Sequence, residues 1–299
     1  MALLIITTIL WAFSFSLIGE YLAGSVDSYF SVLMRVGLAA LVFLPFLRTR
    51  GQSPRTIVLY MLVGAMQLGI MYLLAFRAYL YLTVSEFLLF TVFTPLYITL
   101  IYDLLSGRKL RWGYLLSAAL AVLGAAIIRY DKVSDHFWIG LLLVQLSNLC
   151  FAIGMVGYKR LMEVRPMPQH NAFAWFYVGA FIVAVAAWFM LGNAQKLPTT
   201  TLQWSVLVWL GVVASGLGYF MWNYGATQVD AGTLGIMNNV HVPAGLLVNL
   251  AIWQEQPHWP SFISGALVIL ASLWVHRRWV APHSGQTADD RRRGSAQSE

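Results

Sequence analysis

Apolar residues fill most of this chain in stretches of about twenty, and short polar segments separate the stretches. A helix that crosses a membrane needs about 20 mainly apolar residues. The pattern therefore predicts an all-α membrane protein with ten transmembrane helices. The expected spans are 3–22, 28–47, 56–76, 82–102, 112–128, 137–157, 171–191, 203–224, 231–252 and 260–279. Residues 282–299 are polar, and we expect a disordered cytoplasmic tail there.

Two of the apolar stretches share a pattern. Residues 78–95 (AYLYLTVSEFLLFTVFTP) and 226–243 (ATQVDAGTLGIMNNVHVP) each begin with Ala and reach a proline seventeen residues later. The duplication divides the chain into two repeats, 1–132 and 133–281. Since each repeat has five spans, an odd number, the second repeat must be inverted relative to the first. Inverted repeats with helix breakers at matching places are typical of secondary transporters, whose substrate site lies near the bilayer midplane.

The composition excludes a soluble domain, because 59% of the residues are hydrophobic and 10% are charged, whereas typical globular chains carry about 25% charged residues. The net charge of +7 does not indicate a nucleic-acid partner, because most of the Lys and Arg residues lie in alternate loops and in the tail. Such a bias orients a membrane protein and predicts that both termini are cytoplasmic. The partners that we expect are a small-molecule substrate and membrane lipids.

Several other signatures are missing from the sequence. No basic residue precedes the first apolar run and no cleavage site follows it, so we expect a retained helix and not a signal peptide. The single Cys150 excludes an internal disulfide. No phosphate-binding loop G-x-x-x-x-G-K-S/T occurs, so a gradient or a partner would supply the energy, or transport is facilitated diffusion drawn inward by later metabolism. We expect no cofactor, no bound metal and no covalent catalysis.

The leading candidate for a binding site is a polar cluster in the ninth span. His241 lies ten residues into this span, about 15 Å along the helix and close to the bilayer centre. Asn238 and Asn239 occupy the preceding turn, and Pro243 removes a backbone donor nearby. Buried polar groups of this kind mark substrate pathways. The alternative is a clamp of hydrogen bonds between helices.

Further polar side chains lie in the middle of other spans. Asn148 and Gln145 share a face of the sixth span, Gln67 and Tyr72 lie in the third, and Ser14 lies in the first. Each one alone could be a contact between helices. Their common depth favours a polar cavity that binds substrate.

Three residues, Tyr219, Trp222 and Asn223, lie toward the cytoplasmic end of the eighth span. They could form an inner gate of the substrate pathway. Alternatively, they are anchors at the membrane interface, where aromatic residues are common.

Three charged residues are also candidates. Arg35 lies about 10 Å below the outer surface, seven residues into its span, and a guanidinium there suits a carboxylate substrate. The alternative is a structural ion pair of Arg35 with Glu86. Arg77 lies at the outer mouth, where it could bind or merely attract anions.

The chain resembles the ten-helix EamA-domain group of the drug/metabolite transporter superfamily over about residues 3–280. The matching features are Arg35 with Ala39-Ala40, Ala78 with Tyr81, Ala226 with Val229, Pro95, Pro243, Glu255 and Gly265-Ala266. Within this group, the segments YKRLMEVRPMPQHNAFAWFY and GYFMWNYGATQVDAGTLGIMNN resemble members that take up biotin across the bacterial inner membrane. The resemblance thus implies biotin as the substrate, whereas we interpret Glu255 as structural because the corresponding glutamate of the first repeat is absent. The chain departs from the group at Glu86, where a small residue is usual, and near Gly107-Arg108, where a glutamate is common.

Two other functions remain open at this point. An exporter of amino acids or other metabolites would share every feature above, because topology does not encode direction. An intramembrane serine hydrolase could use Ser215 with His241 as nucleophile and base. Its expected turn is incomplete, however, because Val213 stands where a glycine is needed.

Overall fold

The computed structural model describes residues 2–105, 137–229 and 231–254, together with isolated positions between 120 and 123 and between 259 and 278. All regular elements in these ranges are helices. Several side chains within the ninth span are outside this description, among them those of Asn239 and His241. The predicted spans 112–128 and 260–279, the boundary between the predicted repeats and the tail lie wholly or largely outside the described residues.

Seven helical stretches of the described residues are long and apolar enough to cross a membrane. They are Ala2–Tyr21, Ser28–Phe46, Pro54–Ala78, Val84–Tyr102, Phe137–Val164, Gln169–Leu191 and Thr201–Thr227. They coincide with the first four predicted spans and with the sixth, seventh and eighth, although the sixth continues beyond the predicted end to Val164. The chain is therefore an all-α, multi-pass membrane protein.

Two spans contain a π-helical segment in their middle. The third consists of α3 (Pro54–Gly64), the π segment η2 (Ala65–Ile70) and α4 (Met71–Ala78). The eighth consists of α10 (Thr201–Trp209), the π segment η4 (Leu210–Leu217) and α11 (Gly218–Thr227). Because π segments in helices are often found at functional sites, the region between these two spans is a candidate for the functional site.

The fourth span is interrupted where the sequence has a proline. It consists of α5 (Val84–Phe90), a 3-10 turn η3 (Thr91–Phe93) and α6 (Thr94–Leu105). Pro95 stands in the first turn of α6, where its missing N–H costs little. The ninth span behaves differently, because α12 (Ala231–Val248) continues through Pro243 and ends in the π segment η5 (Asn249–Trp253).

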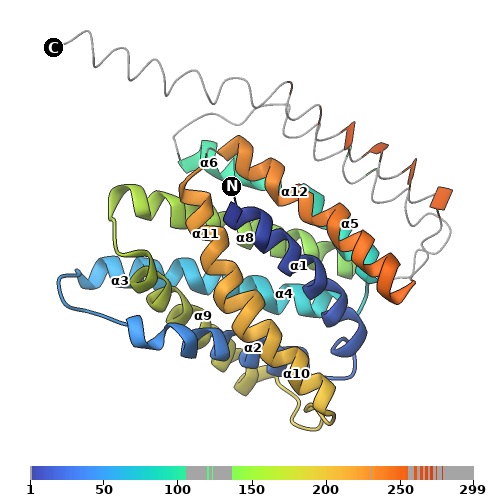
Figure 1. Cartoon of the computed structure of the whole chain (residues 1–299), viewed down its shortest axis with the longest axis horizontal. Coiled ribbons are helices and arrows are strands. Elements are labelled where there is room, and N and C mark those ends of the chain that lie inside the picture. The colour runs from blue at the N-terminus through green and yellow to red at the C-terminus, as the bar shows by residue number, and fades with distance from the viewer. Residues whose placement is uncertain are drawn as a thin grey trace.

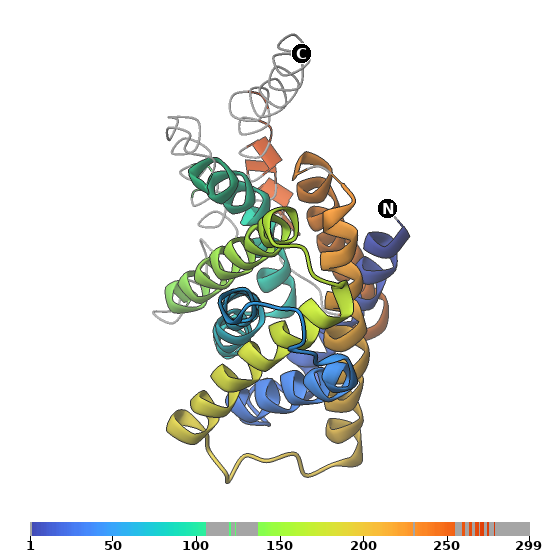
Figure 2. The same cartoon turned by 90° about the vertical axis from the view of Figure 1, so that its left-hand side faces the viewer.

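The helices pack around one another in a bundle (Figure 1). Helix α1 (Ala2–Tyr21) lies beside α11 and α12, and α8 (Phe137–Val164) lies beside α4, η2 and α6. Figure 2 shows α9 (Gln169–Leu191) next to α2 (Ser28–Phe43) and α3, and η4 also contacts α2.

The contact between α3 and α9 depends on two glycines. A Cβ atom on Gly64 would overlap the carbonyl of Phe176, and one on Gly179 would overlap the carbonyl of Met61. The two backbones are therefore in direct contact, as small residues permit in membrane bundles. This crossing brings the third and seventh spans together on one side of the bundle interior.

Candidate functional site

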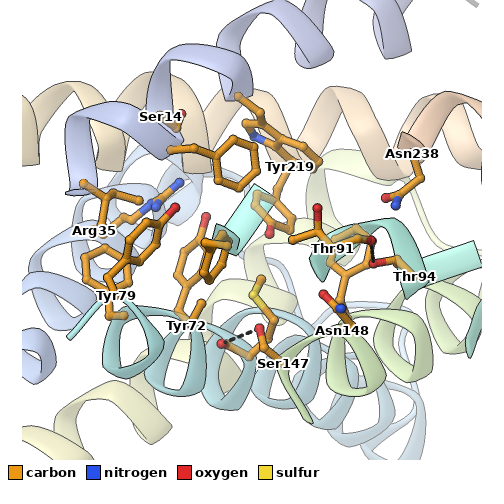
Figure 3. A pocket seen from close by; sticks show the side chains of 18 residues that line it. Ser14, Arg35, Tyr72, Tyr79, Thr91, Thr94, Ser147, Asn148, Tyr219 and Asn238 are labelled. Atoms are coloured by element: carbon orange, nitrogen blue, oxygen red, sulfur yellow. Dashed lines mark hydrogen bonds between the residues drawn. The ribbon is translucent and has the colours of Figure 1, made fainter. Parts of the chain in front are cut away.

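A cavity lies inside the bundle, between helices of both halves of the chain (Figure 3). It encloses about 650 Å³ of atom-free space, counted together with its opening. The described residues that line it are Trp11, Ser14, Phe15, Ile18, Arg35, Met71, Tyr72, Ala75, Phe76, Tyr79, Phe87, Thr91, Thr94, Ser147, Asn148, Phe151, Tyr219 and Asn238. The wall is mostly apolar with a few polar groups, which is the usual character of a small-molecule site.

One end of the cavity carries a buried positive charge. Arg35 is only 3% exposed, its Nε donates a hydrogen bond of 2.6 Å to Ser215 Oγ, and its guanidinium carbon lies 4.1 Å from the centre of the Tyr72 ring. The alternative of an ion pair between Arg35 and Glu86 finds no support, since no described carboxylate pairs with Arg35. A charge inside a membrane costs at least about 2.5 kcal/mol, so this end is suited to an anion.

Glu86 is hydrogen-bonded to the backbone at the start of α5. Its Oε2 accepts a hydrogen bond of 2.9 Å from the backbone N–H of Thr83, whose hydroxyl accepts one of 3.3 Å from the N–H of Glu86. This reciprocal arrangement is a capping box, which satisfies two donors at a helix start. Glu86 is not among the described residues that line the cavity. Neither is Arg77, which lies half-buried at the end of α4 with its guanidinium carbon 5.8 Å from the centre of the Tyr29 ring.

Ser215 is held in place by the surroundings of η4. Trp11 Nε1 donates to the Ala214 carbonyl at 2.9 Å, and the Tyr177 hydroxyl donates to the Ser215 carbonyl at 2.7 Å. The Ser215 hydroxyl also shares a hydrogen bond of 2.9 Å with the Tyr72 hydroxyl. The hydroxyl of Ser215 therefore positions Arg35 and Tyr72, a role different from that of an activated nucleophile.

The other end of the cavity is formed around the break in the fourth span. Asn148 Nδ2 donates to the carbonyl of Phe90 at 2.9 Å, and Gln145 Nε2 donates to the same carbonyl at 3.3 Å. The two side chains share a face, as predicted, with Asn148 Nδ2 3.4 Å from Gln145 Oε1. Only Asn148 is among the described lining residues, because Gln145 turns to the hydroxyl of Tyr97, 3.2 Å away. The amide oxygen of Asn148 is left for a ligand.

Asn238 contributes an unpaired amide to this second end. Its side chain is 1% exposed, and its Nδ2 has no hydrogen-bond partner. Among the described residues, Asn238 and Tyr79 are the two that line the cavity with a buried, unpaired polar atom, and Figure 3 shows them at opposite ends. The backbones of Asn239 and His241 belong to α12, but their side chains are not described. The structure thus places one residue of the leading cluster in the cavity wall.

The remaining predicted residues form a buried layer beside the cavity. Trp222 is fully buried, and its Nε1 donates to Met155 Sδ at 3.4 Å. Gln67 Nε2 donates to Asn223 Oδ1 at 3.1 Å, while Asn223 Nδ2 donates to the Tyr219 carbonyl at 3.1 Å. Interfacial anchoring is therefore wrong for these three residues of the eighth span. Of this layer, only Tyr219 is among the described residues that line the cavity.

Two predicted hydroxyls also line the cavity, but both have partners. Ser14 donates to the Leu10 carbonyl at 3.0 Å, and Tyr72 interacts with Ser215. Most of the lining residues that the sequence did not single out are apolar, such as Phe15, Phe76 and Phe151. Their patterns resemble those of side chains that face lipid, so no sequence signal distinguishes them. The polar exceptions are Tyr79, Thr91, Thr94 and Ser147, and of these Tyr79 lies in a turn between spans.

Comparisons with known proteins agree with these features. The chain is 83% identical over 299 residues, the whole of both chains, to proteins named "Biotin transporter" of Escherichia coli and Salmonella typhimurium. It is 55% identical over 279 residues to a "Probable biotin transporter" of Pseudomonas aeruginosa, covering 93% of this chain and 97% of that protein. A solved crystal structure of a protein shares its fold with a TM-score of 0.64 and 17% identity, over 92% of this chain and 95% of the other.

The sequence profile of the EamA-like transporter family matches residues 1–130 and 138–277. That family consists of transporters, so the serine hydrolase alternative is wrong. The chain belongs to the EamA-like transporter family.

Proposed function

We propose that this protein carries biotin into the cell across the bacterial inner membrane. The observation that carries the proposal is the 83% identity over the full length of two proteins named as biotin transporters. The cavity supports it independently, since it combines a buried cation, unpaired amide groups and apolar walls within the bundle.

The two ends of the cavity match the two polar ends of biotin. The carboxylate would lie at Arg35, whose fork-shaped guanidinium suits carboxylate oxygens. The ureido group, which has a carbonyl acceptor and N–H donors, would lie at the opposite end. There the unpaired Nδ2 of Asn238 can donate to the ureido oxygen, and the free amide oxygen of Asn148 can accept a ureido N–H. Phe15, Phe87 and Phe151 would contact the apolar body between them.

The proposed architecture is ten spans in two inverted five-helix repeats, with both termini in the cytoplasm. Inverted repeats would relate span one to span six, two to seven, three to eight and four to nine by a two-fold axis. Helix packing supports this arrangement, because contacts between two spans have counterparts between the two spans that the axis relates to them. Span three contacts span seven as span eight contacts span two, and span one contacts span nine as span six contacts span four. The two segments matched by the family profile, 1–130 and 138–277, also support the division.

The π segments η2 and η4 also lie at corresponding positions of the third and eighth spans, which the same two-fold axis would relate. Gln67 in η2 and Ser215 in η4 each stand eleven residues before the matched alanines, Ala78 and Ala226. Both side chains reach across to the other span, Gln67 to Asn223 and Ser215 to Tyr72. We infer that the carrier alternates access by motion of one repeat against the other around this central region.

Two measurements test the function. Cells that lack their own biotin uptake should accumulate labelled biotin when they express this protein. Net depletion of preloaded biotin would instead indicate an exporter, and no movement in either direction would contradict biotin as the substrate. Uptake into proteoliposomes, with and without an imposed pH gradient and with competing carboxylates, then measures energy coupling and selectivity.

A further inference from the structure

Tyr79 occupies an unusual place in the cavity wall. It lies in the turn between α4 and α5, yet it is only 6% exposed. Its ring stacks on Phe87, with the ring centres 4.2 Å apart and the planes inclined by 16°. Gly19 of α1 faces the same ring, since a Cβ on that glycine would lie 3.7 Å from two of the ring atoms. Packing on two sides therefore fixes where the hydroxyl points.

The hydroxyl of Tyr79 has no hydrogen-bond partner. An unpaired buried hydroxyl costs about 1–3 kcal/mol, and such groups in native proteins call for an explanation. The hydroxyl lies within the electrostatic influence of Arg35, at the same end of the cavity (Figure 3). Burial raises the pKa of Tyr79 well above its ordinary value, although Arg35 opposes the shift, so the hydroxyl keeps its hydrogen at neutral pH.

Arg35 has donors to spare at this end. Its Nε is used by Ser215, and the described residues provide no carboxylate for the two terminal nitrogens. A carboxylate has two oxygens and about four acceptor sites, more than one side of a guanidinium fork fills. The cavity thus presents a cation and a neutral hydroxyl donor, both lacking an anionic partner.

We propose that Tyr79 is a substrate-binding residue, which donates its hydroxyl hydrogen to the carboxylate that Arg35 neutralises and thereby selects a free acid over its ester or amide. This inference rests on the proposed function of the cavity, whose substrate carries a carboxylate. A primary amide would lack the negative charge and would offer one oxygen acceptor in place of two, next to an NH₂ group that cannot accept a hydrogen bond from Arg35 or Tyr79. A methyl ester would lack the negative charge. A site built from such donors rejects analogues that leave its buried polar groups unpaired.

The test combines one variant with two ligands. Dissociation constants for biotin and for biotin methyl ester are measured on the purified full chain, by displacement or by calorimetry, for the wild type and for Tyr79→Phe. Tyr224→Phe is the matched control, because it removes the hydroxyl of a tyrosine that is 37% exposed and away from the described cavity wall.

We expect Tyr79→Phe to weaken biotin binding roughly ten- to hundredfold, the usual effect of losing a hydrogen bond to a charged group. Binding of the methyl ester should change less than about twofold, and Tyr224→Phe should leave both constants unchanged. Equal weakening of both ligands would show a merely structural effect of Tyr79 and overturn the proposal, as would unchanged biotin binding. Failure of the wild type to bind biotin would instead contradict the proposed function itself.

Discussion

Arg35 Nε donates a hydrogen bond of 2.6 Å to Ser215 Oγ, and this contact joins the second span to the π segment of the eighth. The same serine hydroxyl meets the hydroxyl of Tyr72 in the third span, 2.9 Å away. Three spans from both halves of the chain therefore meet behind one guanidinium. A substrate carboxylate that binds the free nitrogens of Arg35 would contact a group that all three spans hold, which under the proposed alternating access would link binding to the motion of the halves.

The first prediction concerns the charge of Arg35. Arg35→Gln should abolish measurable biotin binding, because it removes the only cation among the described lining residues. Arg35→Lys keeps a charge but loses the fork and the Nε donor, so it should weaken binding at least about tenfold. Displacement of labelled biotin from the purified protein measures both effects.

A control for Arg35 is available on the surface. Arg160 forms an exposed ion pair with Glu163 at 3.0 Å, and the arginine side chain is 37% exposed. Such pairs contribute at most about 1 kcal/mol to stability, so Arg160→Gln should bind biotin as the wild type does. Normal binding by Arg35→Gln would remove the carboxylate site from this end of the cavity.

The second prediction concerns Ser215 as a positioning residue. Ser215→Ala leaves Arg35 Nε and the Tyr72 hydroxyl without their partner, at a cost of about 1–3 kcal/mol. We expect KM for biotin uptake to rise roughly tenfold while the maximal rate changes little, because the substrate contacts themselves remain. Ser205→Ala is the control, since the exposed hydroxyl of Ser205 donates a hydrogen bond to the Thr201 carbonyl in its own helix. A fall in the maximal rate with an unchanged KM would argue against positioning.

The third prediction concerns the ureido end. Asn238→Asp keeps the shape of the side chain but replaces the unpaired Nδ2 donor by an oxygen, which would face the ureido oxygen. Biotin binding should weaken by tenfold or more, and Asn238→Ala should weaken it as well. Asn193→Asp, at an exposed loop asparagine, is the matched control. Calorimetry with the purified protein reports these constants, and unchanged affinity in both Asn238 variants would exclude contact with the ureido group.

The sequence is informative about the spans because the bilayer sets their length. Seven of them appear at the expected places among the described residues, and Pro95 does mark an interruption of the fourth. Polar and charged residues within the spans also identified part of the cavity, including Arg35, Asn148 and Asn238. The physical reason is the same for each, since a polar group in the bilayer interior must find a partner or a wet cavity.

Two features depend on packing that no local pattern reveals. Opposite charge suggested Glu86 as the partner of Arg35, whereas the π segment brings a neutral residue, Ser215, to the guanidinium. Tyr79 lies outside every predicted span, and its burial comes from contacts with α1 and α5 that form only in the folded bundle. The partner of Arg35 and the burial of Tyr79 are therefore set by contacts between distant segments of the chain, which residue type alone does not predict.

The fourth prediction concerns the crossing of α3 and α9. Gly64→Ala and Gly179→Ala would each drive a methyl group into a backbone carbonyl of the facing helix, which only a shift of the helices can relieve. Overpacking of this kind costs about 1–3 kcal/mol or more, so the midpoint of thermal unfolding in detergent should fall. Gly157→Ala is a milder control, because its new Cβ would meet only the Val63 side chain, at 3.3 Å. Equal midpoints for all three variants would contradict the close crossing.

The last prediction concerns the hydrogen bond between Gln67 and Asn223, which ties the π segment of the third span to the eighth span. Hydrogen bonds between membrane helices contribute about 0.6 kcal/mol on average and at most about 1.7. Gln67→Leu and Asn223→Leu should each destabilise the protein, and the double variant should be less destabilised than the sum of the two, with a coupling energy in that range. The free energies of unfolding in detergent of the wild type, the two single variants and the double variant form a double-mutant cycle that gives this coupling energy. Uptake should fall more in the single variants than in the double one, because each single substitution removes the partner of a buried amide between the third and eighth spans. Strict additivity in both measurements would mean that the two side chains act independently.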